Sequence, residues 1–238
     1  MKEKKEKVIR FKKGFIQDWV DAILWAFVVA MIIRNYTFQN FKIPTSSMER
    51  TLLVGDYLYA NKMKYFFNEP KRGEIVTFRN PDDPVEPEPR DRFIKIIPPV
   101  YWSKDKAFFT WYEKKNVVKR VIGLPGDTIR IENKQVYLNG EKFTIPQEQY
   151  TDWRVFRFEE AHCVWNSEIM GSRDNFKEIT VPERNYFVMG DNRDNSLDSR
   201  FFGFLPREDI TGTPGMIFFS RDEIWNEIRK DRFLKVIK

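Results

Sequence analysis

The fold class follows from the run Val117-Val118-Lys119-Arg120-Val121-Ile122, which stops at the turn Gly123-Leu124-Pro125-Gly126-Asp127. Its β-branched residues favour a strand, and a Pro-Gly pair is typical of a tight turn. Next, Thr128-Ile129-Arg130-Ile131 alternates apolar and polar residues, and Gln135-Val136-Tyr137-Leu138 leads into Asn139-Gly140, a pair that favours a hairpin. The stretch therefore predicts successive antiparallel strands.

The same kind of pattern recurs on either side of this stretch. Further strands are predicted at Arg72–Phe78 and at Tyr186–Gly190, and the chain does not alternate strands with helices as a parallel sheet requires. Residues 80–115 and 141–185 interrupt the pattern and are expected to be insertions, the first of which opens with a loop rich in proline and acidic residues. We therefore expect a mainly β fold built from antiparallel sheets.

The first insertion is rich in aromatic residues between positions 101 and 112. This stretch contains Tyr101, Trp102, Phe108, Phe109, Trp111 and Tyr112. Such a cluster forms part of an ordinary core, or it places Trp and Tyr side chains in a lipid interface, where both residue types are enriched. The sequence leaves both interpretations open.

Positive charge is concentrated at the start of the chain. The whole chain has a net charge of +6, and residues 1–13 contain seven Lys and Arg residues against two Glu residues. A basic tail before an apolar stretch is typical of a membrane topology signal. No later segment combines clustered Lys and Arg with a nucleic-acid-binding motif, so we expect no nucleic-acid partner.

An apolar run follows the basic tail, from Ala22 to Ile33, and becomes long enough to cross a bilayer when it is extended from Trp19 to Tyr36. We predict a cytoplasmic tail at residues 1–17, a transmembrane anchor at 18–36 and an exported domain at 37–238. A cleaved signal peptide fits less well, because no small-residue cleavage pattern follows the run. A buried core helix remains an alternative.

A hydroxyl cluster, Pro44-Thr45-Ser46-Ser47-Met48, lies just beyond the apolar run. A serine becomes a good nucleophile only when a base takes its proton. The single histidine, His162, has no recognisable motif around it, which disfavours a Ser-His-Asp triad. Lys119 lies inside an apolar strand, where burial would lower its pKa and leave it neutral enough to act as the base.

The single cysteine and single histidine exclude a zinc site made of four nitrogen and sulfur ligands. We expect no metal and no cofactor. Cys163 is expected to be a small, partly buried residue, since a lone cysteine cannot form an internal disulfide.

Five segments occur in an order that resembles type I signal peptidase (leader peptidase), a serine protease family with a Ser/Lys dyad. They are Pro44–Leu52, Gly55-Asp56, Arg72–Val76, Lys119–Asp127 and Gly190–Arg200. The resemblance implies that Ser47 is the nucleophile and Lys119 the general base. It also implies that the Ser47 N–H and the Thr45 hydroxyl form the oxyanion hole, and that Ser196 orients the lysine.

The resemblance implies further roles near the site. A structural charge network is expected from Asp191, Arg193, Asp198 and Arg200, and shallow substrate pockets are expected to involve Ile43, Pro44 and Val118. Where the family commonly has Ser-Gly-Ser before the methionine, this chain has Thr45-Ser46-Ser47. Ser46 is therefore the rival nucleophile.

Taken together, these features predict an N-terminal transmembrane helix followed by an exported catalytic domain of antiparallel β-sheets. The expected function is a membrane-anchored serine endopeptidase that removes N-terminal signal peptides from exported preproteins. Its expected partners are those signal peptides and the lipid bilayer, and its expected location is the outer face of a bacterial cytoplasmic membrane. A self-cleaving Ser-Lys protease of the LexA kind and an inactive preprotein-binding scaffold are the alternatives.

Overall fold

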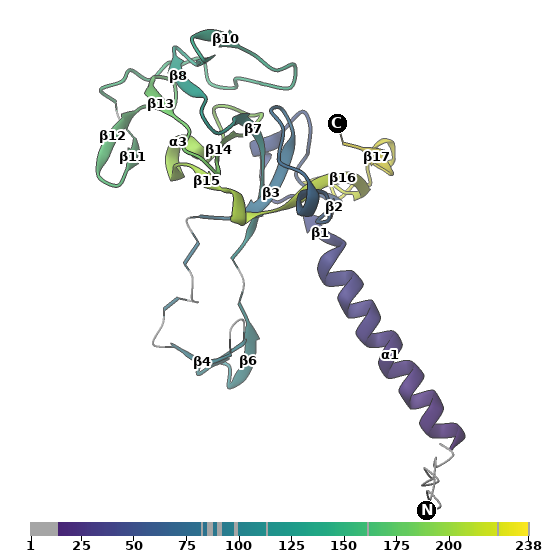
Figure 1. The fold of residues 1–238 in the computed structure, drawn as a ribbon. Coiled ribbons are helices and arrows are strands. Elements are labelled where there is room, and N and C mark those ends of the chain that lie inside the picture. The colour runs from purple at the N-terminus through teal and green to yellow at the C-terminus, as the bar shows by residue number, and fades with distance from the viewer. Residues whose placement is uncertain are drawn as a thin grey trace, which may run out of the picture.

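Among the residues that the structure describes, the fold is mainly β, with three antiparallel sheets and few helices (Figure 1), which confirms the expected mainly β, antiparallel architecture. The structure, a computed structural model, describes residues 14–81, 83–84, 88–89, 92–97, 100–112, 114–160, 162–222 and 224–237. The predicted basic tail therefore lies almost entirely outside the described residues.

The candidate lysine lies on a strand of the largest sheet, and the hydroxyl cluster lies in the connection between two of its strands, β1 and β2. Its strand order is β1-β2-β16-β3-β7-β14-β15, and β17 pairs with β16. The strands are β1 (Phe38–Lys42), β2 (Asp56–Asn61), β3 (Ile75–Arg79), β7 (Asn116–Gly123), β14 (Asn185–Met189), β15 (Leu205–Pro206), β16 (Ile210–Ser220) and β17 (Lys235–Val236). The strands predicted around residues 72–78, 117–122 and 186–190 are thus β3, β7 and β14.

The second sheet has the order β10-β9-β8-β13-β12-β11. Its strands are β8 (Thr128–Glu132), β9 (Gln135–Leu138), β10 (Glu141–Phe143), β11 (Cys163–Trp165), β12 (Glu168–Gly171) and β13 (Phe176–Thr180). The predicted turns connect these strands: Gly126 has φ +86°, and Asn139 and Gly140 have φ values of +51° and +83°. Both residues of a type I′ hairpin turn need positive φ, as is found at Asn139-Gly140. Strands β10–β13 lie in a stretch whose apolar residues show no clear periodicity, so the sequence did not predict them.

The third sheet is small and lies within residues 80–115. Its order is β4-β5-β6, with strands β4 (Phe93–Ile97), β5 (Val100–Ser103) and β6 (Phe108–Trp111). In Figure 1 this small sheet lies below the two larger sheets. At its neck, the N–H of Asn80 donates to the carbonyl of Lys115 at 2.8 Å, which joins the two ends of the segment.

Helices are few and mostly short. In the described part of the chain they comprise α1 (Phe15–Tyr36), α2 (Lys64–Phe67), α3 (Ser199–Phe202) and the 3₁₀ turns η1 (Ser46–Met48), η3 (Arg207–Asp209) and η4 (Lys230–Arg232). In Figure 1, α1 projects away from the sheets and leads directly into β1. Among the described residues, no helix combines the length and the apolar character needed to cross a membrane.

The hydrophobic core next to the hydroxyl cluster fixes where the serines lie. Met48 and Leu52 are fully buried and pack with Leu58, Val118 and Ile217. Since Met48 directly follows Ser47, burial of its side chain anchors the 3₁₀ turn that presents the serine. Val118 of β7 belongs to the same cluster, so this core brings the serine turn against β7.

Candidate active site

The side chains of Ser47 and Lys119 are in contact although the two residues are 72 positions apart in the sequence. Lys119 Nζ donates a hydrogen bond to Ser47 Oγ at 2.6 Å. Ser47 is on η1 and Lys119 is near the middle of β7, and their exposed fractions are 8% and 2%. A buried amine in contact with a hydroxyl is the arrangement that proton transfer from serine requires.

Burial lowers the pKa of Lys119 from 10.5 to about 8, because the charged ammonium loses its hydration. Asp198 opposes this effect, Arg200 adds to it and Asp191 opposes it. With a pKa near 8, about a tenth of the lysine is neutral at pH 7, compared with well under a thousandth for an ordinary lysine. The site can therefore supply a neutral amine near neutral pH.

Ser46 is held away from the lysine. Its Oγ accepts a hydrogen bond from Asn195 Nδ2 at 2.7 Å. The lysine contact goes instead to Ser47, so the geometry favours Ser47 over Ser46 as the group that loses its proton.

The oxyanion donors predicted from the sequence lie beside the Ser47 hydroxyl. The Thr45 and Ser47 hydroxyl oxygens are 3.4 Å apart. Thr45 is the N-cap residue of η1, and the first N–H groups of a helical turn have no acceptor within that turn. The backbone N–H of Ser47 is one of these groups, which makes it available as a second donor.

The loop Gly190–Arg200 packs directly on the serine turn. The N–H of Asn192 donates to the carbonyl of Ser47 at 3.1 Å. A Cβ atom at Gly190 would come within 2.3 Å of Ser196 Oγ and 2.5 Å of the Ser47 carbonyl oxygen. Only glycine therefore fits at this position without moving the loop or Ser47.

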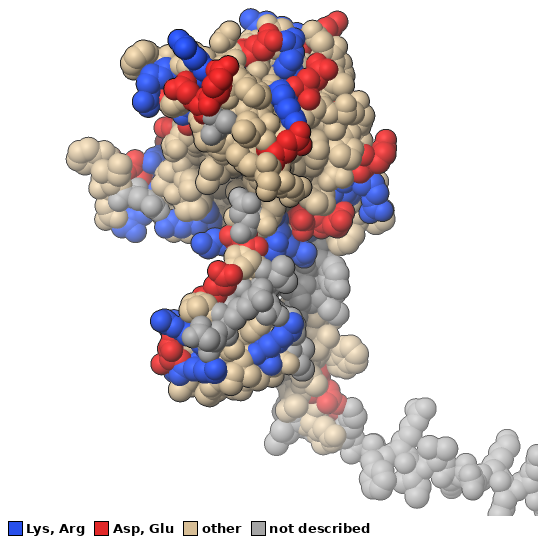
Figure 2. All heavy atoms as spheres, turned by 90° about the vertical axis from the view of Figure 1, so that its left-hand side faces the viewer, with Lys and Arg blue, Asp and Glu red and all other residues tan. Residues whose placement is uncertain are grey.

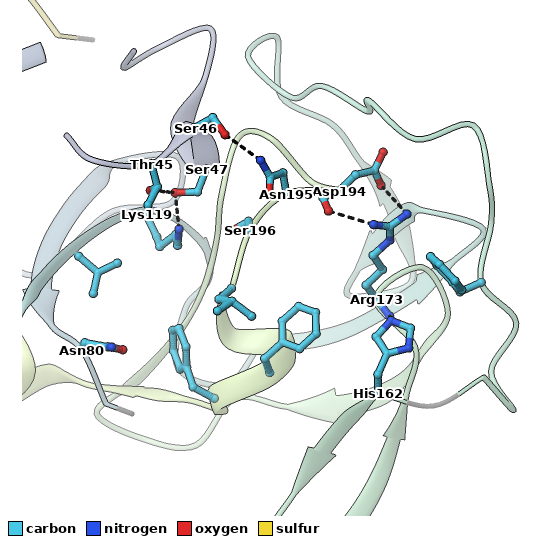
Figure 3. A pocket seen from close by; sticks show the side chains of 15 residues that line it. Thr45, Ser46, Ser47, Asn80, Lys119, His162, Arg173, Asp194, Asn195 and Ser196 are labelled. Carbon is cyan, nitrogen blue, oxygen red and sulfur yellow. Dashed lines mark hydrogen bonds and ion pairs between the residues drawn. The ribbon is translucent and has the colours of Figure 1, made fainter. Parts of the chain in front are cut away.

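Ser196 lies where the sequence predicts it, but without the predicted hydrogen bond. It lines the same cavity as Ser47 and Lys119, and Figure 3 shows it below them. Within the part of the chain that the structure describes, its buried Oγ has no hydrogen-bond partner. Its orienting role remains a prediction.

Two buried ion pairs support the site from behind. Arg120 follows the lysine on β7 and binds both carboxylate oxygens of Asp191 at 2.8 Å, and Thr51 Oγ1 donates to the same carboxylate at 2.6 Å. Arg200 binds both oxygens of Asp198, at 2.9 and 2.8 Å. Each arrangement is bidentate, the geometry that best compensates buried charges.

The Asp198–Arg200 pair also fixes the loop backbone. Asp198 accepts from the N–H of Gly190 at 3.1 Å, and Arg200 donates to the carbonyl of Arg193 at 2.7 Å. Burial alone would raise the pKa of Asp198, but the Arg200 guanidinium outweighs it and holds that pKa below its usual range. Arg193 is itself buried and pairs with Glu148 at 2.9 Å. Of the four predicted network residues, only Asp198 and Arg200 pair with each other. Asp191 pairs with Arg120 and Arg193 pairs with Glu148, so two of the three ion pairs use a partner that the sequence did not predict.

Two cavities meet at Ser47. One has a volume of about 680 Å³ and includes Thr45, Ser47 and Lys119, and the other has about 460 Å³ and includes Ile43, Pro44 and Val118. Thr45, Ser47, Asn80 and Val117 line both, so the cavities form two halves of one groove that passes the serine. All three predicted pocket residues lie in the smaller half, and their role stays a prediction.

The comparison with known proteins agrees with this geometry. The family described as "Signal peptidase, peptidase S26" matches residues 16–219. The chain belongs to this family. The expected family resemblance is therefore confirmed.

Two bacterial relatives show how far the similarity extends. Signal peptidase I of Bacillus amyloliquefaciens is 32% identical over 98% of this chain and all of its own length. Signal peptidase I of Aquifex aeolicus (strain VF5) is 34% identical over 81% of this chain and 80% of its own. Membership of the family supports signal peptide removal by a serine protease.

A solved structure of a signal peptidase I from Enterococcus faecalis V583 is 24% identical. The match covers 61% of this chain and 97% of the solved chain. Its TM-score of 0.37 is too low to add to the family assignment.

His162 lies at the other end of the larger cavity from the dyad (Figure 3). Its Nδ1 lies 2.7 Å from the Glu160 carbonyl oxygen, and its ring lies between those of Phe156 and Phe201. The histidine is thus a member of the cavity wall that the sequence did not predict. Asn80 and Asn195 were also missed, because their place at the groove depends on contacts between distant segments.

Cys163 is fully buried and free, and burial raises the pKa of its thiol to about 12. We expected it to be only partly buried. Across the described ranges, no three His, Cys, Asp or Glu side chains gather as a metal site would require.

Proposed function

We propose that this chain is a membrane-anchored serine endopeptidase that removes N-terminal signal peptides from exported preproteins. One observation carries the proposal: the buried amine of Lys119 lies 2.6 Å from the Ser47 hydroxyl in a chain of the signal peptidase family. The relatives named signal peptidase I support the same activity.

Ser47 is the nucleophile and Lys119 is the general base. Neutral Lys119 accepts the proton of Ser47 as Oγ attacks the scissile carbonyl carbon. The resulting ammonium then gives this proton to the departing amine, and the signal peptide remains bound to Ser47 as an acyl ester. Water attacks the ester carbonyl carbon as its proton passes to Lys119, and the resulting ammonium returns this proton to Ser47 Oγ as the ester C–O bond breaks, which releases the signal peptide as a carboxylic acid and restores the dyad.

The negative charge of the tetrahedral intermediate is stabilised by the Ser47 N–H and the Thr45 hydroxyl. A single oxyanion donor is typically worth about 3–4 kcal/mol in the transition state. The hydroxyl of Thr45 lies close enough to the Ser47 oxygen to share the same reacting centre.

The preprotein binds extended along the groove, pairing its backbone with β7. Within the described chain, β14 pairs only with residues 120–123 of β7, so one side of residues 116–119 is open to an added strand. Ile43, Pro44 and Val118 form the walls that receive small side chains before the cut, which fits the modest volume of about 460 Å³.

Helix α1 anchors the enzyme in the cytoplasmic membrane, with the catalytic domain on the outer face. Large apolar side chains of α1 point to solvent, including Ile23, Trp25 and Phe27. The basic residues of the N-terminal tail favour a cytoplasmic N-terminus. A protease added outside sealed cells should then digest the domain after residue 37, and complete protection would contradict this orientation.

The test is to incubate the purified full-length protein in detergent with a preprotein and to sequence the new N-terminus. A single cut after small residues is expected, and both Ser47→Ala and Lys119→Ala should reduce it at least a thousandfold while the fold is retained. Ser46→Ala and His162→Ala are the matched controls and should keep most of the activity. No cleavage by the wild type would favour a binding scaffold, and cleavage by either dyad variant would contradict the mechanism.

A further inference from the structure

The two halves of the groove differ in their access to Lys119. This lysine lines the cavity of about 680 Å³ but not the cavity of about 460 Å³. In the proposed reaction its ammonium gives a proton to the departing amine, so that amine must lie within hydrogen-bond reach of Nζ. The departing amine belongs to the first residue after the cut. The larger cavity is therefore the half that receives the start of the mature protein, an assignment that rests on the proposed function.

The far end of the larger cavity is lined by aromatic side chains. The His162 ring lies between the rings of Phe156 and Phe201, with centroid distances of 5.2 and 6.2 Å (Figure 3). Both nitrogens of His162 have partners: Nδ1 lies 2.7 Å from the Glu160 carbonyl oxygen, and Nε2 accepts from the N–H of Arg173 at 3.4 Å. The histidine is thus held in place and sets the spacing of the two phenylalanine rings.

Leu197 continues this apolar surface toward the dyad. It follows Ser196 on the loop Gly190–Arg200, and it is 69% exposed although it lines the cavity. Concave sites lined by apolar and aromatic side chains are typical of ligand pockets. We call Phe156, Leu197 and Phe201 the apolar wall.

The polar side chains of the larger cavity are engaged within the protein. Arg173 donates to Asp152 at 2.7 Å and to the carbonyl of Asp194 at 2.9 Å. The Asp194 carboxylate accepts from the N–H of Asp152 at 2.8 Å, and the Asn195 amide donates to Ser46 at 2.7 Å. Because these charges and amides already have partners, the cavity suits an apolar side chain better than a charged one.

The surface charge around the second sheet favours no ionic partner either. Figure 2 views the molecule from the side of β11 and β12, and on the upper body the Lys and Arg side chains are interspersed with Asp and Glu side chains. A surface of mixed sign does not attract substrates of one charge over long distances. Selection of the mature chain here would therefore depend on apolar contact.

We propose that the apolar wall binds an aromatic or large aliphatic side chain from the first residues of the mature protein. Such a side chain gains free energy by leaving water against the rings of Phe156 and Phe201. A volume of about 680 Å³ admits a large side chain, whereas the smaller half receives the small side chains before the cut. The segment 141–185, which contributes Phe156 to the wall, thereby takes part in substrate selection.

The experiment compares preprotein peptides that share one signal sequence and carry a fluorophore far from the cut. One peptide has serine at the first four positions after the cut, and in the others phenylalanine replaces one of these serines in turn. Their affinity is measured by fluorescence anisotropy with the full-length Ser47→Ala protein in detergent, and kcat/KM is measured with the wild type. At one or more positions, phenylalanine should raise both the affinity and kcat/KM at least fivefold.

Leu197→Ser and Phe156→Ser should each reduce this preference to less than twofold, in affinity and in kcat/KM. Leu197→Ser changes an exposed side chain, so the comparison does not depend on the folding of Phe156→Ser. Val155→Ser is the matched control, because Val155 is 45% exposed beside Phe156 but does not line the cavity. This control should keep the fivefold preference.

Equal affinity for the phenylalanine and serine peptides would overturn the proposal. A preference that persists in Leu197→Ser and in folded Phe156→Ser would also overturn it, since it would come from the detergent or from another part of the chain. If Ser47→Ala shows the preference but the wild type cleaves no peptide, only the proposed function fails. If the wild type cleaves every peptide with the same kcat/KM and Ser47→Ala binds them equally, only this inference fails.

Discussion

At the scale of single residues, the site places a titratable amine where water is nearly excluded. Lys119 is 2% exposed, and its pKa falls from 10.5 to about 8. A shift of that size corresponds to about 3 kcal/mol of folding free energy that the charged lysine costs the native state. Lys119, the proposed general base, is therefore expected to destabilise the fold.

Lys119→Met should raise the free energy of unfolding at pH 7 by about 2–3 kcal/mol. Below pH 8 the lysine is protonated in both states, and the native state bears the full cost of burying the charge. Between about pH 8 and 10.5 the unfolded chain binds more protons, so wild-type stability rises with pH relative to the variant and the gap closes. Urea unfolding of both proteins at pH 7 and pH 10 measures this, and a pH-independent gap would contradict it.

Gly190→Ala should reduce preprotein cleavage at least tenfold. The added methyl would meet Ser196 and the Ser47 carbonyl at less than 3 Å, so either the loop or the nucleophile must move. Overpacking of this kind typically also costs about 1–3 kcal/mol of stability. Gly215→Ala is the matched control, because its methyl would have only one neighbour, at 3.7 Å. Equal activity of the two variants would show that the Gly190 contact is unimportant.

At the scale of elements, the loop Gly190–Arg200 depends on a charge pair buried inside it. Asp198→Asn should destabilise the protein by about 3–5 kcal/mol, because it leaves the Arg200 guanidinium buried without a counter-charge. Replacing both residues, Asp198→Leu with Arg200→Met, should cost less than the single change. A denaturant-unfolding double-mutant cycle of Asp198→Leu, Arg200→Met and the double variant measures the coupling, and additive effects would mean that the pair is not coupled.

Sequence patterns predicted the elements whose apolar residues are regularly spaced. β3, β7, β8, β9 and β14 follow from β-branched runs or strict alternation, and the Asn139-Gly140 turn from a pair that tolerates positive φ. The hairpin between β11 and β12 was missed, because its turn, Asn166-Ser167, adopts φ values of +47° and +71° without a glycine.

Side-chain hydrogen bonds define much of the remaining structure between residues 141 and 180. Ser172 Oγ and Asn175 Nδ2 donate to the Phe156 carbonyl, and Asp174 accepts from the Phe156 N–H. Hydrogen bonds of this kind produce no periodic pattern of apolar residues in the sequence. The same limit applies to the candidate site. Family motifs predicted Ser47 and Lys119, but Thr51 and Glu148 contact Asp191 and Arg193 only because folding brings distant segments together, and no sequence pattern predicts such contacts.

At the scale of the whole molecule, attachment to the membrane through α1 can be tested on the full chain. The wild type should stay with membranes after alkaline carbonate extraction. Leu24→Lys with Val28→Lys should release it, since each buried lysine costs about 2.5–3.5 kcal/mol on insertion scales. Leu197→Lys, a change at an exposed site on the catalytic domain, is the control and should stay bound. Release of the wild type would contradict the anchor.

The dyad is tested most directly by the pH dependence of kcat/KM for preprotein cleavage by the full-length enzyme. Only neutral Lys119 can accept the serine proton, so kcat/KM should rise with pH through a single midpoint near 8. Lys119→Met should lie at least a thousandfold lower at every pH. A midpoint near 10.5, or a pH profile that Lys119→Met leaves unchanged, would contradict a buried lysine as the base for Ser47.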